Sequence, residues 1–481
     1  ALTVACAYMG QSALRAAPQA PAEGIRWFAF SAAGLLLLIW FGRSSADTAE
    51  RKWHWPKLSD IPKQRWLYPP ALLLAFAANR LASSANYLNP GVAIGIWVAA
   101  IALAAYALSQ EHLAQEEHSA PEDKEERTFT IRVSVLLFLV ALLVRIYDLA
   151  NHPFILNGTE ASLGLEVLNV LNGVLDNPFT TGWLTNPSLP FFLLAVPTRL
   201  LGPSAESLRL LSSLIGAITV PVLFVIGQRL CGRAVGLVAA ILLLGSHFHI
   251  HYSRSGLTNA WDALLTLLAL GLIAIAWRQE PRGSRQTWLM AGTAVGFSAY
   301  LFTSSHLLPI MLVALGFILL IFDSATVKKQ WRNILAMAAL ALVIALPQLL
   351  HYQASPGIFM ERANALGILD SQSGWLNQEA ARSGMSQIQV LSAQFWQAAL
   401  AFNATIDSGT SYGPFVPLLN FLSGLLAVLG FILALIRIRK IQYSMLVVWL
   451  SVTVIFAGAL LEGPPNSHRY IIAMPAASLL A

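Results

Sequence analysis

A carboxylate that could take a proton from a hydroxyl group occurs near residue 160, in the stretch GTEASLGLEVL. This stretch begins a helical pattern after Asn157, whose residue type suits a helix N-cap. Glu160 is therefore a candidate general base. Glu166 lies most of a helical turn away around the axis, so the two do not form an adjacent carboxylate pair. The alternative is structural, because the helix dipole stabilises a carboxylate in the first turn.

Three histidines, an arginine and an aspartate follow one another in SHFHIHYSRSGLTNAWDALL. His247 and His251 share a helix face and His249 does not, so the spacing does not predict three convergent metal ligands. We expect no metal site here. Arg254 and Asp262 lie near or within the next apolar block, where an ionisable side chain marks either a functional site or an internal ion pair.

Another polar group precedes an apolar block in the stretch PPNSHRYIIAMP. Arg469, which follows His468, either anchors a helix at the lipid headgroups or binds a phosphate, since a guanidinium pairs bidentately with phosphate oxygens. The charged residues of 351–414 are expected to be solvated surface residues. They are Glu361, Arg362, Asp370, Glu379, Arg382 and Asp407.

The elements that must position these residues are membrane helices. Of 481 residues, 56% are hydrophobic and only 11% are charged, against about 25% in soluble domains. The apolar residues form blocks of about 20, enough to cross a bilayer as helices, which satisfy their own backbone in lipid. These blocks are 25–42, 67–86, 90–109, 131–150, 188–202, 207–228, 234–250, 257–277, 286–302, 304–322, 333–350, 415–437, 442–461 and a short one from 468. This composition excludes disordered, fibrous, disulfide-scaffold and soluble globular chains.

The distribution of Lys and Arg predicts the orientation. Loops 43–66, 229–233, 278–286, 323–332 and 437–440 are basic and are expected in the cytoplasm. Loops 151–206 and 351–414 are poor in basic residues and are expected outside. This threading requires the short, proline-rich block 188–202 to lie in the outer interface, which leaves about 13 spans. Orientation also explains the net charge of +6, so no nucleic-acid partner is predicted.

The acidic loop 110–130 divides the chain into two predicted parts. Residues 1–109 form an N-terminal group of about three spans, 110–130 a cytoplasmic linker, and 131–481 a core with the two outer loops. The chain begins at Ala1 without Met, and its last apolar stretch is too short to cross, so both ends are expected to be trimmed or processed.

Residues 131–481 resemble the GT-C glycosyltransferases, in particular the family 39 group with its protein O-mannosyltransferases and aminoarabinose transferases. The resemblance is carried by Arg145 and Tyr147 at the end of the first core span. It is also carried by GTEASLGLEVL, at the place of the family's Asp-Glu-Ala motif, and by the stretches NPSLPFF to SHFHIHYSR and HRYIIAMPAASLLA.

The resemblance implies a GT-C-like helical bundle that moves a sugar from a polyprenyl-phosphate donor to a glycan, lipid or protein acceptor at the outer face. Glu160 would be the base, with a contribution from Asp262. Arg254 and Arg469 would hold the phosphate, Asn186 and His468 would bind substrate, and loop 351–414 would cover the site. No resident cofactor and no metal-ligating residues are predicted, whereas the sequence leaves open whether a divalent metal takes part. The location implied is a bacterial-type plasma membrane.

Three positions depart from the family pattern. Thr159 stands in place of the motif's Asp, Asn186 in place of Lys or His, and Asn259 in place of a further Asp. A threonine hydroxyl is no base near neutral pH without an activator. The alternative is therefore a non-catalytic GT-C-like accessory subunit that binds partner membrane subunits. A flippase is a third alternative, but the paired broken spans that carriers often show are absent from the sequence pattern.

Overall fold

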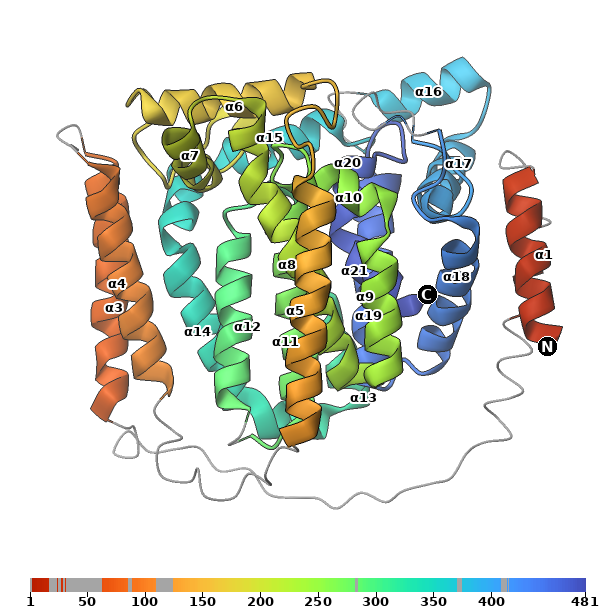
Figure 1. The fold of residues 1–481 in the computed structure, drawn as a ribbon, viewed down its shortest axis with the longest axis horizontal. Helices are drawn as coiled ribbons and strands as arrows, with labels where there is room; N and C mark the ends of the chain where they lie inside the picture. The colour runs from red at the N-terminus through yellow and green to blue at the C-terminus, as the bar shows by residue number, and fades with distance from the viewer. Residues whose placement is uncertain are drawn as a thin grey trace.

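The computed structural model describes residues 2–16, 63–84, 89–109, 124–281, 284–369, 374–407 and 415–481, together with Gly24, Trp27, Phe28, Ser31 and Gly413. Within these ranges the chain forms a bundle of helices (Figure 1), and its extended pairings are two isolated bridges, Thr181–Pro187 and Gly367–Leu461. The described residues therefore confirm the predicted all-α class.

Seven helices among the described residues are long and apolar enough to cross a membrane. They are α4 (Pro90–Ser109), α5 (Lys124–Ile146), α8 (Ala205–Cys231), α11 (Asn259–Arg278), α13 (Phe302–Phe322), α14 (Ser324–Ala354) and α19 with its π-helical turn η6 (Ile441–Ala459). An eighth span results if α9 (Arg233–Leu244) and α10 (His247–Ser253), which meet at 62°, cross together. The chain is an integral membrane protein.

The predicted count of about 13 spans is not confirmed. Three predicted spans correspond to shorter helices, namely α3 (Tyr68–Ala82), α12 (Arg285–Ser298) and α18 (Phe421–Ile436). Most of block 25–42, of loop 43–66 and of the linker 110–130 lies outside the described residues. The division of the chain at that linker stays a prediction.

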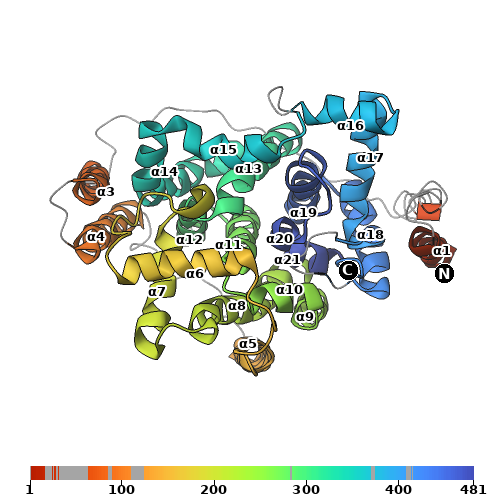
Figure 2. The same ribbon diagram turned by 90° about the horizontal axis from the view of Figure 1, so that it is seen from above.

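Several helices gather at one end of the bundle, which we call the upper end. Here α6 (Gly158–Leu171), α15 (Pro356–Leu366) and α16 (Trp375–Ser383) lie across the long helices (Figures 1 and 2). The two predicted outer loops thus lie at the same end. Helix α7 (Leu189–Leu201), which packs against α6, has 13 residues. That gives about 20 Å at 1.5 Å per residue, too short for a hydrocarbon core of about 30 Å.

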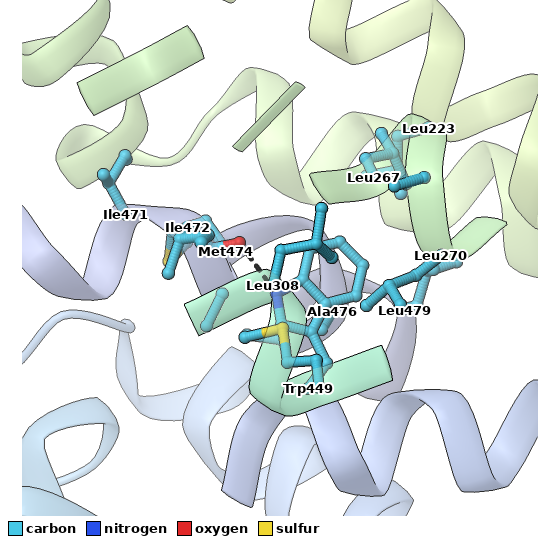
Figure 3. Close-up of a cluster of buried hydrophobic side chains, with 14 of the residues drawn as sticks. Leu223, Leu267, Leu270, Leu308, Trp449, Ile471, Ile472, Met474, Ala476 and Leu479 are labelled. Carbon is cyan, nitrogen blue, oxygen red and sulfur yellow. Dashed lines mark hydrogen bonds between the residues drawn. The ribbon is translucent and has the colours of Figure 1, made fainter. Parts of the chain in front are cut away.

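The centre of the bundle is filled by a segment made of α20 (Ser467–Tyr470), η7 (Ile471–Ala473) and α21 (Met474–Leu480). Figure 3 shows Met474 and Leu479 of this segment in one buried cluster with Leu223 of α8, Leu267 of α11 and Leu308 of α13. The indole N–H of Trp449 donates to the Ile472 carbonyl at 3.0 Å. This burial holds α20, which carries two predicted site residues, against the long helices.

The N-terminal helices contact the core on opposite edges (Figure 1). On one edge α3 and α4 pack against α14, where the Trp97 indole donates to the Ile344 carbonyl at 3.0 Å and the Asn79 amide to the Pro347 carbonyl at 2.9 Å. On the other edge α1 (Leu2–Ala16) lies beside α18, with the Arg15 guanidinium donating to the Leu419 carbonyl at 3.0 Å.

Candidate active site

A cavity of about 80 Å³ lies where five segments meet near the upper end of the bundle. Its walls come from α6, from Asn186 in the turn before α7, and from the starts of α11, α13 and α20. The lining residues are Thr159, Leu163, Asn186, Leu257, Thr258, Asn259, Asp262, Phe302, Thr303 and His468. We call it the Asp262 cavity. It brings together three of the six predicted site residues, which are far apart in the sequence.

Asp262 is 2% exposed and lies in the first turn of α11. Its Oδ1 accepts hydrogen bonds from the Ser304 backbone N–H at 2.7 Å and from the Ser304 hydroxyl at 2.5 Å. Ser304 is in the first turn of α13, where backbone N–H groups have no partner within the helix. The aspartate is thus buried beside two helix N-termini, whose dipoles favour a negative charge.

A second cavity of about 80 Å³ shares Phe302 and Thr303 with the first. Its other lining residues include His306 and Arg469, so we call it the Arg469 cavity. Helix α20 therefore contributes His468 to one cavity and Arg469 to its neighbour. The Asn259 amide donates to the His468 carbonyl at 2.9 Å, which joins the starts of α11 and α20. An acid and a cation thus face adjoining spaces.

Glu160 does not line either cavity. It is 0% exposed, and Arg209 donates to both of its oxygens, from Nε to Oε1 at 2.7 Å and from NH2 to Oε2 at 3.1 Å. Its Oε1 also accepts from the Gly256 backbone N–H at 2.6 Å. The preceding residue, Thr159, faces the Asp262 cavity instead. The carboxylate of Glu160, the base implied by the resemblance, is therefore occupied by partners within the protein and faces neither cavity.

Arg209 was missed by the sequence analysis. It lies near the start of the apolar block 207–228, and an arginine at such a position signals a buried partner. Besides Glu160, its NH1 donates to the Leu149 and Pro153 carbonyls, each at 3.0 Å. The ion pair thus holds the loop after α5 against α6 and α8.

Arg254 also makes structural contacts. Its guanidinium donates to the carbonyls of Val144 at 2.8 Å and Tyr147 at 2.7 Å, and to that of His152 at 3.1 Å. Arg254 and Asp262 do not form the internal ion pair that was one of the two expectations. Asp262 is instead hydrogen-bonded to Ser304. Asp148 lies in the same loop, and the hydrogen bond that its carboxylate accepts from Asn151 lowers its pKa below the usual value.

The remaining predicted residues are dispersed. His249 is buried, with Nδ1 2.9 Å from Arg145 NH2, and the described residues hold no cluster of His, Cys, Asp and Glu with metal-binding geometry. The expectation of a solvated Asp407 is wrong. It is 5% exposed and accepts from the Ser467 backbone N–H at 3.1 Å, which joins the chain after α17 (Gln387–Ala399) to the start of α20. Asp370 and the side chain of Arg362 lie outside the described residues.

Comparison with protein families agrees with the resemblance. A family model described as dolichyl-phosphate-mannose-protein mannosyltransferase matches residues 185–351. This stretch contains Asn186, Arg254 and Asp262, whereas Glu160 and α20 lie outside it. The predicted resemblance to GT-C glycosyltransferases is therefore confirmed over this part of the chain. A comparison with curated protein sequences finds no match.

Two solved structures are similar at low sequence identity. The archaeal oligosaccharyltransferase AglB from Archaeoglobus fulgidus, in complex with an inhibitory peptide and a dolichol-phosphate, is 15% identical with a TM-score of 0.46, over 74% of this chain and 50% of that one. ArnT from Cupriavidus metallidurans, bound to undecaprenyl phosphate, is 14% identical with a TM-score of 0.39, over 75% and 77%. This chain thus spans about half the length of the archaeal enzyme.

Proposed function

We propose that this protein is a glycosyltransferase that moves a sugar from a polyprenyl-phosphate donor to an acceptor hydroxyl at the outer face of a bacterial-type plasma membrane. The observation that carries the proposal is the pairing of two adjoining cavities, one with the buried Asp262 and one with Arg469. The match of 185–351 to a mannosyltransferase family model supports the same chemistry. We further propose that the chain belongs to the family 39 group and that its acceptor is a glycan, a lipid or a protein.

In this mechanism Asp262 acts as the general base. Its carboxylate takes the proton of the acceptor hydroxyl, and the acceptor oxygen attacks the anomeric carbon of the donor sugar. The bond from that carbon to the phosphate oxygen breaks, and the polyprenyl phosphate leaves with its negative charge paired to Arg469. A positioned base contributes typically about 10²–10⁴-fold to the rate.

The neutral polar residues of the Asp262 cavity would bind the sugar. Thr159, Asn186 and Asn259 offer a hydroxyl and two amides, which donate to and accept from sugar hydroxyl groups. Glu160 receives a positioning role, since its two oxygens are bonded to Arg209 and Gly256. By holding the start of α6, it keeps Thr159 at the cavity wall.

The test is turnover of a polyprenyl-phosphate-sugar donor in proteoliposomes, with release of polyprenyl phosphate as the readout. Asp262→Asn keeps the size of the side chain and removes the base, so turnover should fall by roughly 10²–10⁴-fold. Asp148→Asn is the matched control, because Asp148 lies at the same end of the bundle outside both cavities. Equal turnover of Asp262→Asn and wild type would remove Asp262 from the mechanism.

A second candidate function is a non-catalytic accessory subunit of a membrane complex. It is favoured by the fact that Thr159, Asn186 and Asn259, the three positions where the family pattern has ionisable residues, all line the Asp262 cavity. If wild type releases no polyprenyl phosphate from any donor while it stays folded in the membrane, this candidate replaces the transferase.

A further inference from the structure

A large polar cleft lies at the upper end beside the Arg469 cavity, between α16, α17 and the turn after η6. Its volume is about 740 Å³, within the roughly 300–1,000 Å³ of pockets that bind small molecules. We call it the Trp375 cleft. It is lined by Trp375, Gln378, Glu379, Arg382, Gln394, Gln397, Glu462 and Gly463. None of these residues takes part in the mechanism above.

The side chains of the cleft match the chemistry of a sugar. Three primary amides and two carboxylates donate to or accept from hydroxyl groups, and an indole ring packs against an apolar C–H face. The charge is also informative. Arg382 is paired with Glu379 at 2.9 Å through both Nε and NH2, which leaves Glu462 as an additional negative charge. The cleft thus disfavours anionic ligands and suits a neutral glycan.

Gln394 supplies an independent indication that a ligand binds here. Its side chain is only 7% exposed, and its Oε1 is buried without a hydrogen-bond partner. Gln394 nevertheless lines the cleft. A buried amide oxygen without a donor is unfavourable, so such a group in a folded protein calls for a partner. A hydroxyl group of a bound sugar would donate to it.

The cleft and the Arg469 cavity are separated by a single extended segment. The Ile368 backbone N–H donates to the Leu460 carbonyl at 3.1 Å, and the Glu462 N–H donates to the Leu366 carbonyl at 3.0 Å. Successive side chains of an extended chain point to opposite sides. Accordingly, Leu461 lines the Arg469 cavity and Glu462 lines the cleft. A molecule in the cleft therefore lies next to the space where the donor phosphate would bind.

We propose that the Trp375 cleft is a carbohydrate-binding subsite for a neutral oligosaccharide, which is the acceptor of the transfer. The role of this oligosaccharide as the acceptor rests on the proposed function, whereas its binding in the cleft does not. The indole of Trp375 stacks on one sugar ring, and Gln394 accepts from a hydroxyl of the same glycan. The acceptor's reactive end then extends past Leu461 toward the two cavities.

The test measures binding without any donor. Full-length protein in lipid nanodiscs is applied to an array of neutral, acidic and amino-sugar oligosaccharides and to an array of Ser/Thr-containing peptides. Wild type should retain neutral oligosaccharides, and Trp375→Ala and Gln394→Ala should each reduce retention by roughly 2–10-fold, as expected for a lost stacking or hydrogen-bonding group. Trp66→Ala is the matched control, because Trp66, in η2 (Lys63–Leu67), is 63% exposed and outside the cleft.

The outcomes separate this inference from the proposed function. If wild type releases polyprenyl phosphate but retains no oligosaccharide, the subsite is wrong and the transferase stands. If it retains neutral oligosaccharides but turns over no donor, the subsite stands as a binding site and the transferase is wrong. Retention of peptides alone, or an equal loss in Trp66→Ala, overturns the subsite. Trp375→Phe, which keeps an aromatic ring, should recover part of the binding and guards against misfolding of Trp375→Ala.

Discussion

Arg209 and Glu160 form a fully buried ion pair in which Nε and NH2 of the guanidinium each donate to a different carboxylate oxygen, at 2.7 and 3.1 Å. The pair joins α8 to the start of α6. Because both charged groups are buried away from water, they are compatible with a stable fold only when both are present. Removal of one partner leaves the other charge buried and uncompensated.

Glu160→Gln should therefore lower the free energy of unfolding by about 3–5 kcal/mol. Replacement of Arg209 by Met in the same chain should recover part of the loss, because the uncompensated guanidinium is removed. Thermal unfolding in detergent, followed by tryptophan fluorescence, measures both variants. Glu166→Gln is the matched control in the same helix, where the carboxylate accepts from the Trp183 N–H. Wild-type stability of Glu160→Gln would contradict the structural role.

Ser304→Ala should destabilise the site around Asp262. The variant keeps the backbone N–H bond and loses the hydroxyl bond to the carboxylate, a charge-assisted contact worth about 1.5–3 kcal/mol. Ser304→Thr keeps the hydroxyl and should retain most of the stability. The neighbouring Ser305→Ala loses the contacts of its hydroxyl with the Phe302 carbonyl and with Nδ1 of His306, neither of them a carboxylate, and should cost about 1 kcal/mol. Equal unfolding temperatures for Ser304→Ala and Ser305→Ala would count against this account.

Arg469→Ala should weaken binding of the donor phosphate. Loss of a hydrogen bond to a charged group, about 1.5–3 kcal/mol, corresponds to a KM for the donor that is higher by roughly 10–150-fold. Arg469→Lys should recover only part, because an ammonium does not pair bidentately. Arg439→Ala, in the predicted cytoplasmic turn, should leave the KM unchanged. The same KM in Arg469→Ala and wild type would exclude this arginine as the phosphate ligand.

The predicted orientation can be measured by cysteine labelling. Cys6 and Cys231 are first replaced by alanine, and single cysteines are placed at Thr180 and Lys328. Because basic loops stay in the cytoplasm, a membrane-impermeant reagent should reach position 180 from outside and position 328 only after the membrane is opened. Labelling of both positions from one side would refute the orientation.

The sequence predicted the architecture better than the roles of individual residues. Blocks of apolar residues identified the helices at 90–109, 205–231 and 259–278, because a run of that length has few other stable forms. The count of spans was not confirmed, partly because hydropathy measures the length of an apolar block and not where the helix within it begins and ends. The blocks 67–86, 286–302 and 415–437 contain the shorter helices α3, α12 and α18, which have 15, 14 and 16 residues.

The candidate site was partly predictable for a related reason. Asp262 stood out because a carboxylate within an apolar block is costly unless it is used or paired. Glu160 and Arg254 have the residue types of a catalytic site, and only their hydrogen-bond partners show that their contacts are structural. Those partners are Arg209 and the backbone carbonyls in the last turn of α5 and directly after it, which become neighbours only when distant segments fold together. Sequence spacing alone does not encode these contacts.

The segment at the centre of the bundle has a consequence for biogenesis. Residues 467–480 pack among α8, α11, α13 and α19, and the Tyr252 hydroxyl lies 2.6 Å from that of Ser467. The surrounding helices all precede this segment in the sequence, so a ribosome delivers them first. The Asp262 cavity gains His468, and the Arg469 cavity gains Arg469, only after residues 467–480 have been made. Assembly of the candidate site is therefore one of the last steps in the biogenesis of the described bundle.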